Sequence, residues 1–101
     1  MTARPSGLAR AIERSARAAG LPFEIDSHQS SAWHSITFSG ERHRIAGRAM
    51  AGRAFDEWAA SLDGRAIHLS GALVADLTVS DCERADGIAR FRIEGVTVAM
   101  A

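Results

Sequence analysis

Alternation of apolar and polar residues between positions 23 and 50 constrains the fold more than any other feature of the sequence. In a strand, side chains at every second position share a face, so residues 23–28, 33–39 and 42–50 are predicted to be half-buried strands. Two tight turns, at Ser30-Ser31 and Gly40-Glu41, would join them. The shared apolar face would contain Phe23, Ile25, Ile36, Phe38 and Ile45. The pattern therefore predicts a three-stranded antiparallel meander.

Two segments have the periodicity of amphipathic helices. The first, residues 7–19, has apolar side chains on one side and arginines on the other. We expect it to begin after Ser6, a good N-cap, and to stop at Gly20. The second, residues 53–63, has an apolar face of similar width and would stop at Gly64. Glycine suits both stops because it adopts the left-handed backbone conformation without steric cost.

The C-terminal third predicts two further strands. In residues 67–79 most of the apolar side chains fall on odd-numbered positions, which predicts a strand with one apolar face. Residues 80–87 are expected to form a polar loop, and the last strand begins near Ile88. Within the last strand the apolar side chains change from odd positions (Phe91, Ile93) to even positions (Val96, Val98). One extra residue would keep them on the same face, so we expect a β-bulge at Glu94-Gly95. The expected element order is therefore αβββαββ. This order predicts one compact α+β domain over residues 1–101, with a mainly antiparallel five-stranded sheet and two helices packed on one face.

Composition limits the classes of function. The chain has 12 acidic and 12 basic residues, and every basic residue is arginine. A net charge of zero predicts no general attraction to nucleic acid or to a membrane surface, and the absence of lysine excludes Schiff-base chemistry. The only cysteine, Cys82, permits no internal disulfide and favours a cytoplasmic location. No segment approaches the roughly 18 apolar residues of a membrane span.

The histidines and glycines do not form a recognisable site. His28, His34, His43 and His68 suggest zinc, but in the predicted register His28 faces away from His34, and His34 and His43 lie about 13 Å apart along the strands. The segment GRAMAGRA at 47–54 has the glycine spacing of a phosphate-binding loop but lacks its lysine and hydroxyl. We therefore expect no metal, no cofactor and no catalytic residue.

A recognition surface is predicted on the face of the meander opposite the core. The predicted register places Trp33 between His28 and Arg48, with Arg44 on the same face. An indole between an imidazole and a guanidinium could stack on a flat ligand or on a partner's side chain. These four residues are the predicted site for a ligand or a partner.

Three functional hypotheses follow. We expect a non-catalytic interaction or oligomerisation module that uses the Trp33 face or a sheet edge, as a homodimer or with a protein partner. The alternative is a small cofactor-independent enzyme with a cleft in a dimeric α+β barrel, in which His34 or His43 would be the acid or base. RNA binding is less favoured. Residues 7–63 have the αβββα order of a double-stranded-RNA-binding domain, but the second helix begins Arg53-Ala54-Phe55-Asp56-Glu57, without that family's basic cluster.

Overall fold

The computed structural model describes residues 7–62, 67–69 and 71–99 and confirms the α+β class. The elements are α1 (Gly7–Ala18), β1 (Phe23–His34), β2 (Ser39–Met50), α2 (Arg53–Ser61), β3 (Ala72–Ala85) and β4 (Ile88–Ala99). Both predicted helices are present, within two residues of their expected ends. The predicted Ser6 cap and Gly64 stop lie outside the described residues.

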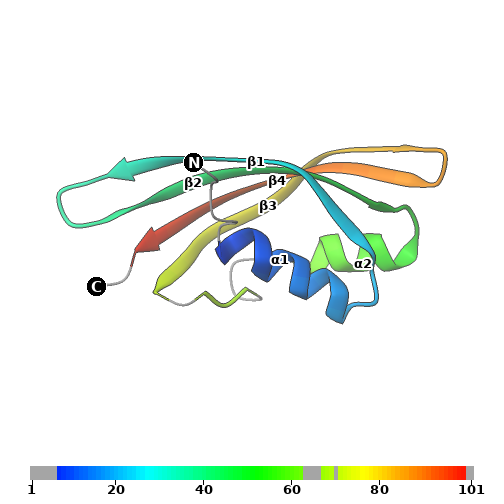
Figure 1. Ribbon diagram of the computed structural model, residues 1–101, viewed down its shortest axis with the longest axis horizontal. Coiled ribbons are helices and arrows are strands. Elements are labelled where there is room, and N and C mark those ends of the chain that lie inside the picture. The colour runs from blue at the N-terminus through cyan, green and yellow to red at the C-terminus, as the bar shows by residue number, and fades with distance from the viewer. Residues whose placement is uncertain (1–6, 63–66, 70, 100–101) are drawn as a thin grey trace.

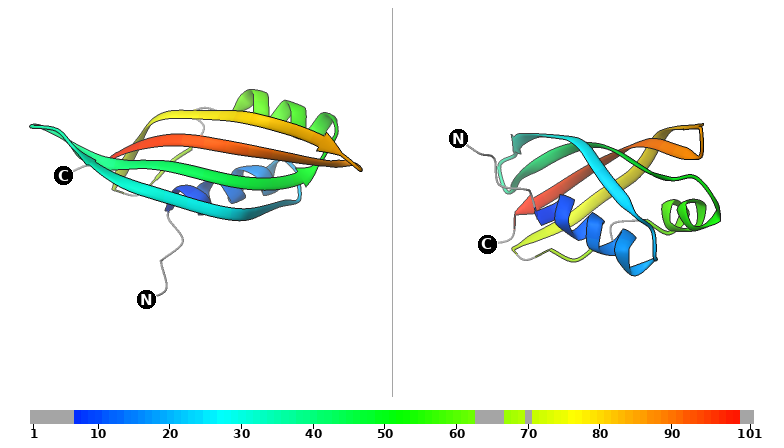
Figure 2. Two further views of the ribbon diagram at one scale, coloured as in Figure 1. Left: turned by 90° about the horizontal axis from the view of Figure 1, so that it is seen from above. Right: turned by 45° about the vertical axis from the view of Figure 1, so that its right-hand side comes forward.

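The strands form one antiparallel sheet in the order β1-β2-β4-β3. Figures 1 and 2 show that α1 and α2 lie on the same side of this twisted sheet, as predicted. We call the helix-covered side the inner face and the opposite side the open face. Each helix and the hairpin that follows it make an αββ half, and the β2–β4 ladder joins the two halves.

Helix α1 buries one side against the sheet and ends as its sequence predicts. Leu8, Ile12 and Ala16 are spaced at four-residue intervals and are all buried. Gly20 has φ +72°, and the Leu21 N–H donates to the carbonyl of Ala16 at 2.9 Å. This six-to-one hydrogen bond is that of a Schellman motif, which satisfies a carbonyl at the helix end.

Aromatic side chains join both helices to the sheet. The Phe91 ring of β4 lies 5.2 Å from Phe55 of α2 and 5.4 Å from Phe23 of β1, centroid to centroid. Trp58 of α2 is 3% exposed, and its indole N–H donates to the Ser15 hydroxyl of α1 at 3.1 Å. Burial of each such ring stabilises the fold by about 1.5–3 kcal/mol, so this cluster holds α2 in place.

The first hairpin differs from the predicted meander. β1 continues through the predicted turn at Ser30-Ser31, and the chain turns instead at residues 35–38. There the Ser35 N–H donates to the Phe38 carbonyl at 2.7 Å, and the Ser35 hydroxyl accepts from the Phe38 N–H at 3.0 Å. Ile36 and Phe38 are therefore exposed turn residues, and their predicted place in the core is wrong. The described residues form four strands, in the order αββαββ, where the sequence predicted five.

The second hairpin also departs from expectation. β4 pairs regularly with β2 through 94–95, so the predicted bulge there is wrong. The irregularities lie in β3, at Ala75 and between Ser80 and Glu83. β3 runs through most of the predicted loop and turns at Asp86 and Gly87, whose φ angles of +54° and +76° are those of a type I′ turn. An Asp-Gly pair is a strong sequence signal for this turn.

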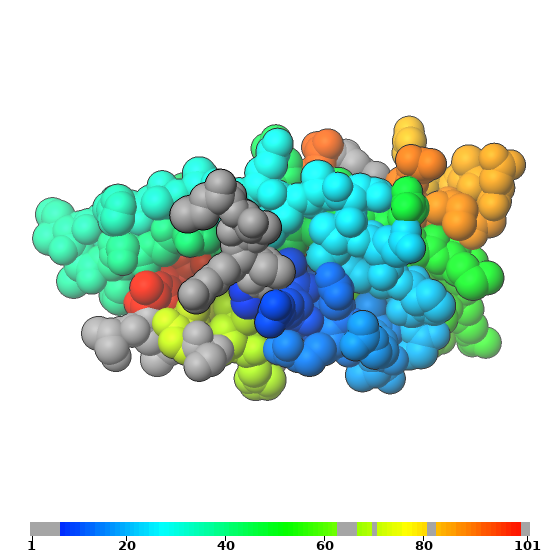
Figure 3. Space-filling model, in the orientation of Figure 1, coloured from blue at the N-terminus to red at the C-terminus, as the bar shows by residue number. Residues whose placement is uncertain are grey.

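The molecule is elongated, with extents of 46 × 28 × 21 Å. The distal part of the β1–β2 hairpin, residues 30–42, extends past α1 at the left of Figures 1 and 3. We call this segment the arm. No helix in the described part of the chain is long and apolar enough to cross a bilayer.

Candidate functional site

The four predicted site residues do not come together. Trp33, Arg44 and Arg48 lie on the open face, whereas His28 lies on the inner face. Trp33 pairs with Gly40 across the β1–β2 ladder. Arg48 is eight residues further along β2, a separation of about 26 Å. The predicted placement of Trp33 between His28 and Arg48 is therefore wrong, while binding by these residues individually stays a prediction.

A bulge in β1 explains the position of His28. The register with β2 shifts between Ile25 and Ser27, which leaves Asp26 as an extra residue. An extra residue reverses which side chains point to each face. His28 therefore pairs with Ile45, a fully buried residue of the inner face.

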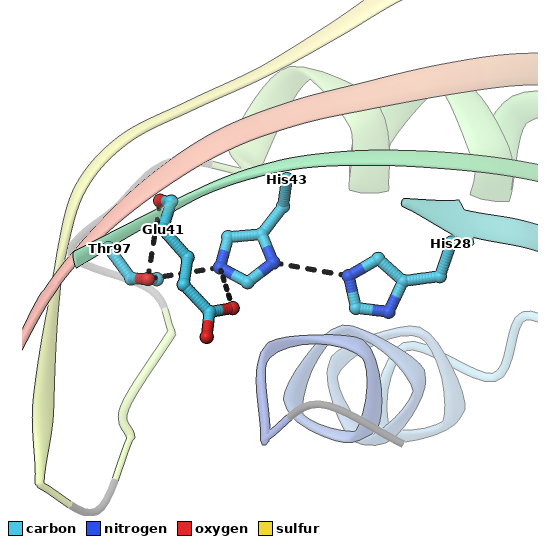
Figure 4. A network of polar contacts seen from close by, with 4 residues as sticks. All are labelled: His28, Glu41, His43 and Thr97. Atoms are coloured by element: carbon cyan, nitrogen blue, oxygen red, sulfur yellow. Dashed lines mark hydrogen bonds and ion pairs between the residues drawn. The ribbon is translucent and has the colours of Figure 1, made fainter. Parts of the chain in front are cut away.

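A polar network of the buried His43 and Thr97 and the partly buried His28 occupies the inner face (Figure 4). His43 and Thr97 are 6% and 7% exposed. The His28 Nε2 and His43 Nδ1 atoms are 3.1 Å apart, and His43 Nε2 is 3.0 Å from the Thr97 hydroxyl. That hydroxyl donates to the Glu41 carbonyl at 3.4 Å, so we assign the His43 Nε2–H as donor to Thr97. The His28 Nε2–H then donates to His43, and all three side chains are linked in one direction.

Burial favours the neutral form of both imidazoles of the network. Desolvation lowers the pKa of His43, opposed by the nearby Glu41 carboxylate, which lies 3.7 Å from Nε2. The pKa of His28 is also lowered by desolvation, with Glu41 again acting in the opposite direction. Both ring nitrogens of His43 already have partners within the protein, so His43 is not free to act as the acid or base of the enzyme hypothesis. His34, the other histidine of that hypothesis, lies in the arm outside this network.

Sequence reasoning did not find this network. The uninterrupted alternation placed His28 and His43 on different faces, and only the bulge at Asp26 brings them to the same one. No local sequence signal marks that bulge. Among residues 7–62, 67–69 and 71–99, no group of three His, Cys, Asp or Glu side chains is arranged to hold a metal.

The open face has an apolar end beside the arm. Across the sheet, Trp33 is followed by Gly40, Val98 and Leu73 in register. The Trp33 ring packs over Gly40, where a Cβ atom would lie 3.0 Å from it. The Trp33 indole nitrogen is buried without a hydrogen-bond partner, and Leu73 is 58% exposed. We call these four residues the apolar end.

Charged side chains cover the rest of the open face. Arg44 of β2 and Glu94 of β4 are paired in register and 3.9 Å apart. Further along, Arg48 contacts Glu24 at 2.6 Å and Asp26 at 3.1 Å. The hydrogen bonds that Arg48 donates to the Glu24 carboxylate, together with the charge of Asp26, raise the pKa of Arg48. Its guanidinium is thus already paired with two carboxylates, and it lies far from the Trp33 ring on which it was predicted to stack.

Two of the larger hollows in the described part of the chain lie on these faces. A groove of about 540 Å³ crosses the open face beside Arg44 and Glu94. A cavity of about 560 Å³ lies on the inner face, between α1 and the arm, with His43 and Thr97 in its wall. Comparison of the chain with protein-family models, with curated proteins and with solved structures gave no match.

Proposed function

We propose that this chain is a non-catalytic association module that forms a homodimer through the open face of its sheet. The observation that carries the proposal is the self-complementary pattern of side chains on that face. The cytoplasm is the proposed location on composition alone, since one cysteine allows no internal disulfide.

The pattern follows from the β2–β4 register. Consider a two-fold axis that runs parallel to the strands between β2 and β4, with two open faces packed together. Such an axis places each residue of β2 over its own β4 partner in the second copy. Arg44 would then face Glu94 of the second copy, and Glu94 would face Arg44. In the same way Gly40 of one copy would lie against Val98 of the other, so that a small residue packs against a larger one.

The apolar end adds area to this contact. The same axis exchanges β1 with β3, so Trp33 of one copy would pack on Leu73 of the other. Ile36 and Phe38, both exposed in the turn of the arm, lie at the same end of the sheet. Exposed apolar side chains that gather at one end of a surface are typical of an interface between proteins.

The contact is confined to this end of the face. At the other end Arg48 pairs with Arg90 in register, and the two-fold axis would place these like charges over each other. Two aligned sheets also cross at about 30°, which limits their overlap. We therefore expect an interface centred on the β2–β4 ladder near Arg44, Glu94 and Val98.

The first experiment measures oligomeric state in two matched variants. Sedimentation velocity of the purified protein should show a dimer. Leu73→Glu, which places a charge in the apolar end, should raise the dimer dissociation constant at least about tenfold. Met50→Glu is the control, because Met50 is 63% exposed on the same face at the opposite end. A monomer at all concentrations tested, or equal effects of the two substitutions, would contradict the proposal.

A charge reversal tests the two-fold axis itself. Arg44→Glu should weaken the dimer because the new glutamate of each copy would then face Glu94 of the other copy. Glu94→Arg should weaken it for the corresponding reason. The double variant R44E/E94R should restore association, since opposite charges again face each other. Both side chains are more than half exposed, so neither substitution should much affect the stability of the monomer. Failure of the double variant to recover association would exclude this packing.

A further inference from the structure

The inner-face cavity has the size and the position of a small-molecule site. Its volume of about 560 Å³ lies within the range of roughly 300–1,000 Å³ that is common for ligand pockets. It is open to solvent on one side and is bounded by the start of α1, the arm, the chain before β3 and the end of β4. The sheet separates it from the proposed dimer interface on the open face.

Much of the cavity wall is apolar. The apolar side chains that line it are those of Leu8, Leu69, Ala72, Ala32 and Ala99. Leu8 also belongs to the core and is 2% exposed, so this part of the wall is held by the packed interior. Such a surface favours a ligand with an apolar body of several carbon atoms.

Two arginines at the cavity have unused hydrogen-bonding capacity. Arg10 and Arg14 are four residues apart on α1, so their side chains lie on the same side of the helix, and both line the cavity. Neither makes an ion pair or a side-chain hydrogen bond with any residue that the structure describes. Two adjacent guanidinium groups can bind a carboxylate through several charge-assisted hydrogen bonds.

The remaining polar groups define the charge of the ligand. Glu41, also in the wall, is the acidic residue among those that line the cavity. Two arginines and one glutamate give the ionised lining a charge of +1, which a single carboxylate neutralises. His43 and Thr97 also line the cavity, and their side chains are hydrogen-bonded within the protein. His34 and His68 are also part of its polar wall.

We propose that this cavity binds a small monocarboxylate with an apolar body, whose carboxylate is held by Arg10 and Arg14 and whose carbon skeleton packs against Leu8, Leu69 and Ala72. This inference is independent of the homodimer proposed above. The two can fail separately, because the residues involved lie on opposite faces of the sheet.

Titration calorimetry with 2-naphthoate tests the site, with 2-naphthamide as the neutral ligand of the same shape. We expect the protein to bind the carboxylate at least about tenfold more tightly than the amide. The double variant R10Q/R14Q should lose that preference. Arg17→Gln is the matched control, because Arg17 is exposed on the same helix but does not line this cavity. It should leave binding unchanged, and none of these variants should alter the oligomeric state.

A second variant distinguishes a specific effect on binding from damage to the fold. Glu41→Gln removes the opposing charge and should strengthen 2-naphthoate binding roughly threefold. Damage to the fold could not produce a gain of affinity. The proposal is overturned by an absence of saturable binding at millimolar 2-naphthoate, by equal affinities for the acid and the amide, or by an equal loss in Arg17→Gln.

Discussion

Asp26 determines which side chains meet on the inner face of the sheet. It is the extra residue of the β1 bulge, and its carboxylate pairs with the Arg48 guanidinium at 3.1 Å on the open face. Before it, Ile25 points inward, and after it His28 does the same. Without the bulge His28 would point away from His43. One residue thus creates the only contact between an imidazole of β1 and one of β2 that the described residues show.

The neutral His28–His43 pair predicts a loss of stability in mild acid. Because burial lowers both pKa values below the ordinary value of about 6.5, the unfolded chain binds protons first as the pH falls. The free energy of unfolding should therefore decrease as pH drops below about 6.5, and the loss should end once the folded-state pKa values are passed. Urea denaturation at a series of pH values measures this effect.

The same two histidines provide the control for that measurement. Their imidazole resonances should titrate below about pH 6.5 in the folded protein and near 6.5 in concentrated urea. Midpoints for the folded protein at or above those in urea would refute the explanation.

Residues that follow a simple periodicity were predictable, and those that depend on a turn were not. Phe23, Ile25 and Ile45 lie on the inner face as the alternation predicts. Ile36 and Phe38 have the same alternation, but the hydrogen bonds of Ser35 place them in an exposed turn. Alternation indicates a strand only where the backbone pairs, and pairing depends on residues distant in sequence.

At the scale of the elements, the turn between β3 and β4 sets the length of both strands. Asp86 and Gly87 both have positive φ, which lets β3 continue to the turn itself. Gly87→Ala should destabilise the protein by about 1 kcal/mol, because alanine is strained at φ +76° although no atom lies within 4 Å of its Cβ.

Asp86→Asn is the companion variant for this turn. Asparagine tolerates the left-handed conformation well, so stability should change by less than about 0.5 kcal/mol. Chemical denaturation of both variants measures the difference. Equal stability of Gly87→Ala and the unsubstituted protein would show that the turn does not limit the hairpin.

Helices were easier to predict than strand partners because their signals are local. The spacing of Leu8, Ile12 and Ala16 and the stop at Gly20 all lie within one short segment. The order β1-β2-β4-β3 instead depends on contacts between residues that are distant in sequence, such as Gly40 and Val98, which are 58 positions apart. The candidate network of His28, His43 and Thr97 depends on the same long-range pairing and on the unpredicted bulge.

At the scale of the molecule, support for the sheet is unequal along its length. The helices cover the inner face near Ile45 and Phe91, whereas the arm, residues 30–42, extends beyond them (Figure 1). Most arm residues of β1 are exposed. A segment with few buried apolar contacts opens at a lower free energy than the core.

Hydrogen exchange should reveal this difference within a single strand. Backbone amides of the arm should exchange at least about tenfold faster than those of residues 45–49 in β2. Measurement by NMR on the Arg44→Glu variant removes any protection that a second copy would add. Uniform protection along β2 would mean that the arm unfolds only together with the core.

The positions of the two tryptophans allow their intrinsic fluorescence to report on two different parts of the molecule. Trp58 is sealed in the core against Ser15, whereas Trp33 lies partly exposed over Gly40 on the opposite side of the sheet. The chain contains no tyrosine, so its near-ultraviolet emission comes from these two indoles alone. Trp33→Phe would leave the emission of Trp58, which reports denaturation of the core. Trp58→Phe would leave the emission of Trp33, which reports association at the open face without an added dye.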